Sequence, residues 1–246
     1  MRSKILLFGD SITQFGFGAD GAFGWVSMLA NAYTRRADVL NRGFSGYNTR
    51  HALDVLPSVL GEDGKSSGRD TIFCTVFFGA NDAALPGTRQ HVPIEEYSEN
   101  IRLVVGNMRA NLKGSVDGDD VPIILITPPP VHDKGWERWC TEMGRDKSQR
   151  SNEASRAYGE ALKSVGTELG CSILDTYSLL EGDKPGFEKH LTDGLHLNGS
   201  GNEVIYDGLM NMIRANYPDL APMEYDDDRP GATGIPMDGK LWQELC

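Results

Sequence analysis

The sequence lacks any apolar run long enough to cross a bilayer. The longest runs, such as residues 72–80 and 121–127, fall far short of the roughly 18–20 residues that a membrane-spanning helix requires. A strand-like run that starts at residue 4 also leaves no room for a secretory signal peptide before it. We therefore expect no membrane span and a cytoplasmic location.

Cysteine and basic residues are also scarce. The four cysteines are widely scattered and predict neither a disulfide framework nor a zinc site. Lysine and arginine total 24 against 35 acidic residues, a net charge of −11. Because a phosphate backbone would be repelled by this charge, we expect no nucleic-acid partner.

The remaining composition is that of an ordinary globular chain, with 39% apolar and 24% charged residues in 246 positions. Short apolar runs alternate with longer amphipathic segments, the pattern of β-α-β units around a mostly parallel sheet. The predicted strands are 4–9, 38–41, 71–78, 121–127 and 171–175, and the predicted helices are 25–36, 49–60, 94–112, 149–169 and 200–216. The near-continuous apolar run at 71–78 is expected at the centre of the sheet.

The composition changes after the last predicted helix. From Tyr217 onward the chain is rich in proline, glycine and acidic residues. We expect one folded domain over residues 1–216, followed by an acidic tail over 217–246 that packs on its surface.

Four polar clusters follow predicted strands or precede the last helix. Because parallel strands direct their carboxyl ends to one edge of a sheet, these clusters are expected to converge there. Their candidate functional residues are Ser11, Gly43, Asn81 together with Asp82, and Asp193 together with His196.

These residue types match the needs of ester cleavage. A serine hydroxyl needs an imidazole to take its proton and a carboxylate to orient that imidazole, which Ser11, His196 and Asp193 can supply. The three-residue spacing of Asp193 and His196 lets one loop bring the pair together. The Ser11 and Gly43 backbone N–H groups and the Asn81 carboxamide are the predicted donors to the oxyanion. This chemistry requires neither a cofactor nor a metal.

Other residues near these clusters have more than one interpretation. We expect Asp10 and Asp82 to support the site by accepting hydrogen bonds that hold its turns. A substrate pocket is predicted from Phe15, Trp25, Pro129 and Trp136, although the aromatic residues fit core packing equally well.

The motifs Gly9-Asp10-Ser11-Ile12, Gly79-x-Asn81-Asp82 and Asp193-x-x-His196, with Gly43, resemble the four sequence blocks of the SGNH/GDSL hydrolases over residues 5–200. The resemblance implies a three-layer α/β/α flavodoxin-like fold with a five-stranded parallel sheet. Within this family, the segment Thr127-Pro128-Pro129-Pro130 followed by Trp136 most resembles the isoamyl acetate-hydrolysing esterase branch. That branch acts on short acyl esters without a metal.

Several alternatives stay open. The ester substrate could be a sugar acetate, a thioester or a lipid-like lysophospholipid, and the oligomeric state could be a homodimer. A non-catalytic relic of the fold would bind a ligand without turnover. A third alternative is Mg²⁺-dependent phosphoryl transfer on Asp10, Asp82 and Asp193.

Overall fold

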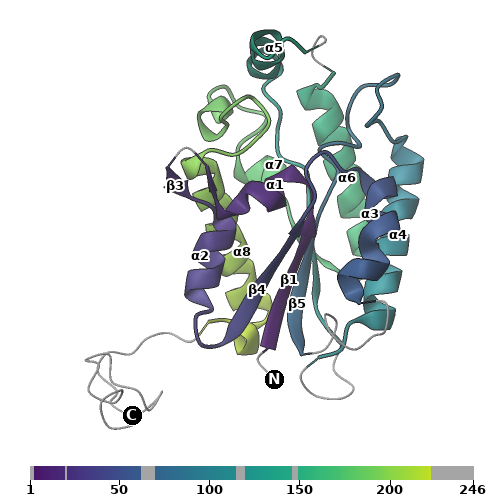
Figure 1. Ribbon diagram of the computed structural model, residues 1–246, viewed down its shortest axis with the longest axis vertical. Helices are drawn as coiled ribbons and strands as arrows, with labels where there is room; N and C mark the ends of the chain where they lie inside the picture. The colour runs from purple at the N-terminus through teal and green to yellow at the C-terminus, as the bar shows by residue number, and fades with distance from the viewer. Residues whose placement is uncertain (1–2, 20, 62–69, 115–119, 146–148, 223–246) are drawn as a thin grey trace.

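The sheet at the centre of the molecule is parallel and has the predicted five strands. The structure, a computed structural model, describes residues 3–19, 21–61, 70–114, 120–145 and 149–222 (Figure 1). The strands lie in the order β4-β1-β5-β6-β7, where β1 is Ser3–Gly9, β4 is Ala37–Gly43, β5 is Thr71–Phe77, β6 is Ile123–Ile126 and β7 is Ser172–Leu174. The prediction that residues 71–78 form the central strand is confirmed.

Helices cover both faces of the sheet. On one face lie α2 (Trp25–Ala32) and α8 (Gly199–Asn216), and on the other lie α3 (Thr49–Leu60), α4 (Ile94–Asn111) and α6 (Asn152–Glu168) (Figure 1). Strand β1 contributes to both cores, because successive side chains of a strand point to opposite faces. Ile5 and Leu7 join the first core and Leu6 and Phe8 the second. The predicted three-layer α/β/α architecture is therefore confirmed.

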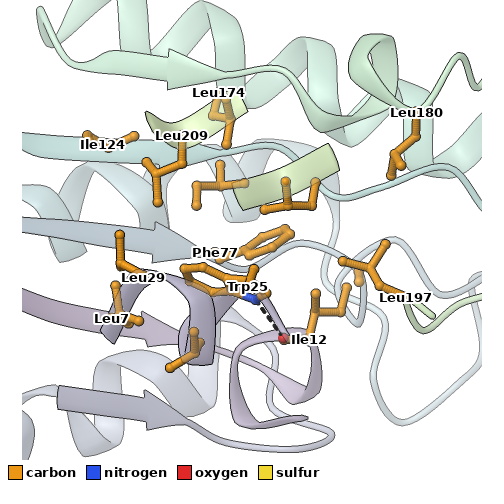
Figure 2. Close-up of a cluster of buried hydrophobic side chains, with 14 of the residues drawn as sticks. Leu7, Ile12, Trp25, Leu29, Phe77, Ile124, Leu174, Leu180, Leu197 and Leu209 are labelled. Atoms are coloured by element: carbon orange, nitrogen blue, oxygen red, sulfur yellow. Dashed lines mark hydrogen bonds between the residues drawn. The ribbon is translucent and has the colours of Figure 1, made fainter. Parts of the chain in front are cut away.

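Trp25 belongs to the core and not to a substrate pocket, contrary to one of the two sequence interpretations. Its side chain is fully buried, packs edge-on against Phe77, and donates a hydrogen bond of 3.2 Å from Nε1 to the Ile12 carbonyl (Figure 2). The indole therefore ties α2 to the segment that follows β1.

The structure adds elements that the sequence pattern did not predict. They are α1 (Ser11–Gln14), the 3-10 helix η1 (Phe15–Phe17), the hairpin of β2 (Gly18–Ala19) and β3 (Ala22–Phe23), α5 (Asp133–Glu142), α7 (Thr176–Leu179), and the 3-10 helices η2 (Phe187–His190) and η3 (Pro218–Leu220). All but the ten-residue helix α5 have four residues or fewer and are too short to show a helical or strand period. Most of them lie near the carboxyl ends of the strands, at the upper end of Figure 1.

The segment after α8 contacts the residues that follow α2. The Tyr33 hydroxyl donates to the Leu220 carbonyl at 2.8 Å, and Arg36 donates to the carbonyls of Asp219 and Ala221. The rest of the predicted acidic tail, from residue 223, lies outside the described residues. Within the described ranges, no helix combines the length and apolar character that crossing a bilayer requires.

Candidate active site

Ser11 stands at the first position of α1, directly after the carboxyl end of β1. The sharp turn depends on Gly9, since a Cβ there would lie 2.1 Å from Thr13 Oγ1 and 2.7 Å from the Phe77 carbonyl oxygen. Asp10 then caps α1, because its Oδ1 accepts from Ile12 N at 2.9 Å. This contact agrees with the supporting role predicted for Asp10.

Ser11, His196 and Asp193 form one continuous hydrogen-bonded series, here called the Ser11 chain. Ser11 Oγ lies 2.9 Å from His196 Nε2, and His196 Nδ1 lies 2.6 Å from Asp193 Oδ2. Asp193 Oδ1 also accepts from the backbone N–H groups of Leu195 and His196, at 2.9 and 2.8 Å. The loop therefore orients its own carboxylate and imidazole, while the fold brings in the serine from 185 positions away.

A second hydrogen-bonded group surrounds Asn81, beyond the carboxyl end of β5. Asn81 Oδ1 accepts from Gln90 Nε2 and from an Arg150 guanidinium nitrogen, both at 2.9 Å. Its Nδ2 donates to the Tyr47 carbonyl at 2.8 Å. Gln90 Nε2 donates also to the Gly46 carbonyl at 2.9 Å. We call Asn81, Gln90, Arg150 and Gly46 the Asn81 network.

Gly43 does not fit its predicted role as an oxyanion donor. Its N–H already donates to Asn41 Oδ1 at 2.8 Å, and a Cβ on it would lie 2.1 Å from Gln14 N. The absence of a side chain at Gly43 thus lets β4 pack closely against α1. Gly46, three residues later, has φ +81°. Gln90 connects Gly46 to Asn81, because Gln90 Nε2 donates both to the Gly46 carbonyl and to Asn81 Oδ1. Its N–H has no hydrogen-bond partner within the described part of the chain.

The sequence matches known proteins along almost all of this fold. Residues 7–204 match the model of the GDSL-like lipase/acylhydrolase family. The chain belongs to this family. It is 42% identical over 220 residues to isoamyl acetate-hydrolyzing esterase 1 homolog of Bos taurus, which covers 88% of this chain and 84% of that protein.

Two further comparisons agree with this assignment. Isoamyl acetate-hydrolyzing esterase of Saccharomyces cerevisiae is 34% identical over 233 residues, which covers 90% of this chain and 91% of that protein. The crystal structure of the lipase/acylhydrolase from Enterococcus faecalis superposes with a TM-score of 0.67 at 25% identity, covering 92% of this chain and all of the other. The predicted family and its esterase branch are confirmed, and the chain is a carboxylic ester hydrolase.

Two fully buried carboxyl groups of this GDSL-like hydrolase, Asp10 and Asp82, have raised pKa values. Burial raises the pKa of Asp10 to about 7, against the lowering effects of the Ile12 N–H, His196 and Arg150. Burial likewise raises the pKa of Asp82 to about 6, although the Thr49 N–H and hydroxyl donate to its Oδ1. Asp82 thus supports the start of α3, as a supporting residue should.

Asp193 differs from these two carboxyl groups. Burial raises its pKa, but hydrogen bonds from His196 and from the Leu195 and His196 N–H groups outweigh burial and lower the pKa below its ordinary value. Asp193 is therefore ionised beside the imidazole, as an orienting carboxylate must be.

Two of the four predicted pocket residues face the Ser11 chain. Phe15 is 46% exposed and lies edge-on to His196 with ring centroids 5.7 Å apart. Trp136 lies edge-on to the same imidazole at 6.3 Å. Pro129 is buried, and its carbonyl accepts from Ser155 Oγ at 2.5 Å, so it anchors α6 instead of lining a pocket.

A cavity of about 300 Å³ opens beside the imidazole. Ile12, Phe15 and Leu197 give it apolar walls, and Thr192 and Asn202 add polar groups. Its volume lies at the lower end of the range for ligand sites, which is roughly 300–1,000 Å³.

The carboxylates considered for a magnesium site do not share a common point. Asp10 binds the first turn of α1, Asp82 binds Thr49, and Asp193 binds His196. In the described ranges no three histidine, cysteine or acidic residues converge as metal ligands. The geometry therefore matches acyl transfer better than the phosphoryl-transfer alternative.

Proposed function

We propose that this hydrolase is a serine esterase that cleaves small carboxylic esters with short acyl groups through an acyl-enzyme. The observation that carries the proposal is the Ser11 chain, in which Ser11 Oγ lies 2.9 Å from His196 Nε2 and Asp193 holds the other imidazole nitrogen at 2.6 Å. This is the arrangement that activates a serine hydroxyl as a nucleophile.

The reaction has two acyl-transfer steps. Ser11 Oγ attacks the ester carbonyl carbon while its proton passes to His196 Nε2, and the carbonyl electron pair moves onto oxygen. The tetrahedral intermediate collapses, the C–O bond to the alcohol breaks, and His196 returns the proton to that alcohol. Water then attacks the acyl group by the same route and releases the acid.

Three donors are suited to the developing oxyanion. Ser11 N heads α1, Gly46 N has no acceptor among the described residues, and Asn81 Nδ2 has a second N–H besides the one given to Tyr47. The other neighbour of Asn81 Nδ2 is Asp10 Oδ2 at 3.5 Å, a distance too long for a strong hydrogen bond. Gly46 therefore replaces Gly43 in the proposal.

The preference for short acyl groups has two supports. The cavity beside His196 holds only about 300 Å³ and has apolar walls. Similar proteins from cattle and yeast carry names that refer to isoamyl acetate, an ester of a two-carbon acid. The cytoplasmic location and the homodimer stay predictions.

The test is hydrolysis of p-nitrophenyl esters by wild type, Ser11→Ala and the control Ser58→Ala, whose serine is exposed on α3. We expect Ser58→Ala to equal wild type and Ser11→Ala to lose activity, with fluorophosphonate labelling only where Ser11 is present. Equal rates for wild type and Ser11→Ala would contradict the proposal, and an unlabelled, inactive wild type would identify a non-catalytic relic.

The acyl group is tested separately. We expect kcat/KM to fall from p-nitrophenyl acetate and butyrate to octanoate and palmitate. Acetylated xylo-oligosaccharide and lysophosphatidylcholine are compared in the same assay, and a clear preference for either would replace the small-ester assignment with a sugar deacetylase or a lysophospholipase.

A further inference from the structure

Arg150 is a buried cation whose acceptors belong to the active-site loops. The residue is 7% exposed although it lies just before Ser151, the N-cap of α6. The guanidinium donates to Asn81 Oδ1 and to Gln90 Oε1, both at 2.9 Å, and to the Ala80 carbonyl. Burying a guanidinium costs free energy unless acceptors replace water, and here the acceptors lie at and next to Asn81.

Gln90 connects the two candidate oxyanion donors outside α1. Its Nε2 donates to Asn81 Oδ1 and to the Gly46 carbonyl, both at 2.9 Å, while its Oε1 accepts from Arg150. All three contacts use the one carboxamide, so Asn81 and Gly46 cannot shift independently of Gln90. The Gln90 carbonyl is in turn held by Asn48 Nδ2 at 2.9 Å, at the beginning of α3.

These contacts decide which way the Asn81 carboxamide faces. A guanidinium has only donors, so the Asn81 atom that faces it must be the oxygen. A flipped amide would set its N–H groups against both Arg150 and Gln90 and would lose both hydrogen bonds. The cation at Oδ1 also polarises the carboxamide, which makes the Nδ2–H a stronger donor.

We propose that Arg150 and Gln90 are positioning residues for ester hydrolysis: they hold the Asn81 carboxamide and the Gly46 backbone in the orientation that binds the oxyanion. In this role, neither residue contacts the ester itself. The inference rests on the proposed serine mechanism, and it assigns a function to two residues outside the family motifs discussed above.

Steady-state kinetics separate this role from general destabilisation. For Arg150→Met and Gln90→Met we expect kcat on p-nitrophenyl acetate to fall about 10- to 100-fold, with KM within about threefold, because the lost interaction operates in the transition state. Arg150→Lys keeps the charge but loses the planar fork, so it should recover part of the rate. Arg156→Met, an exposed substitution on α6, serves as the control and should equal wild type.

A boronic acid provides a readout that stability alone does not change. It forms a tetrahedral adduct on the serine, so its affinity should fall by the same factor as kcat/KM in each variant.

A double-mutant cycle adds the decisive measurement. Because Arg150 contacts Asn81 directly and reaches Gly46 only indirectly through Gln90, Arg150→Met should cost less than about threefold when Asn81 is already alanine.

The outcomes distinguish the inference from the function on which it rests. If wild type is not labelled by a fluorophosphonate at Ser11, the serine mechanism itself fails. If wild type is labelled but both methionine variants keep wild-type kcat and boronate affinity, the positioning role alone is overturned. Full additivity with Asn81→Ala also overturns it. Should Arg150→Met not fold, Gln90→Met and Arg150→Lys still decide between these results.

Discussion

The Ser11 chain and the Asn81 network lie at the same end of the sheet but are built in different ways. Two members of the chain, Asp193 and His196, come from one short loop, and the His196 side chain is 24% exposed. The network comes from the loops after β4 and β5 and from the segment before α6, and its members Asn81 and Arg150 are buried.

The difference matches the role that we propose for each group. A proton acceptor must meet both the serine and the leaving alcohol, so it lies where substrate and water arrive. Oxyanion donors must already be oriented when charge develops, because reorientation during the reaction would reduce their effect. A buried network that holds the Asn81 carboxamide in one orientation is suited to that task.

The largest expected effect breaks the Ser11 chain. In His196→Ala no group is left to take the serine proton, so we expect kcat to fall about 10⁴- to 10⁶-fold. The measurement is kcat on p-nitrophenyl acetate. His190→Ala, which removes an imidazole bound to Ser200, is the control and should be fully active. Activity of His196→Ala within tenfold of wild type would contradict the assignment of the base.

Breaking the Asn81 network should have a smaller effect. Asn81→Ala removes one oxyanion donor and leaves the Ser11 chain intact, so we expect kcat to fall about 10²- to 10³-fold. Fluorophosphonate should still label Ser11, at a reduced rate. A loss as large as that of His196→Ala, with no labelling at all, would mean that Asn81 also maintains the nucleophile.

Asp10 links the two groups, since its Oδ1 caps α1 and its Oδ2 faces Asn81. Its pKa is raised from 3.8 to about 7, so the folded protein retains a proton that the unfolded chain releases. The stabilisation from this proton is complete below the ordinary pKa and is lost as the pH rises through about 7.

Denaturation by urea between pH 4 and 7 tests this linkage. We expect the free energy of unfolding of wild type to fall with rising pH relative to Asp10→Asn, by up to about 1.4 kcal/mol per pH unit. Asn keeps an oxygen for the Ile12 N–H but does not titrate. Asp54→Asn, exposed on α3, should keep the wild-type slope. A wild-type slope in Asp10→Asn would refute the linkage.

The smallest effect is expected at Phe15, which contacts the Ser11 chain but not the Asn81 network. Phe15→Ala opens one wall of the cavity beside His196, and we expect KM for p-nitrophenyl acetate to rise about three- to tenfold with kcat nearly unchanged. Phe23→Ala, an exposed substitution on the neighbouring hairpin, is the matched control. A fall in kcat as large as that of Asn81→Ala would show that Phe15 orients the imidazole.

Local patterns were enough to predict much of this protein. Apolar periodicity identified the five strands and the helices α2, α3, α4, α6 and α8, because that pattern reports which face of each element is buried. It missed the ten-residue helix α5. Ser11, Asn81, Asp193 and His196 were found because each follows a strand or precedes a helix in a short motif. The three-residue spacing of Asp193 and His196 was enough to predict their contact.

Tertiary structure alone decided the rest. Arg150 and Gln90 look like ordinary surface residues in the sequence, and only the folded loop after β5 and the segment before α6 bring them to Asn81. Gly43 was the predicted glycine donor until its N–H proved to be bound to Asn41, and Trp25 was a pocket candidate until α2 buried it against Phe77. The physical reason is the same throughout: periodicity and spacing describe a residue's own element, whereas hydrogen-bond satisfaction and burial depend on neighbours that folding brings from distant parts of the chain.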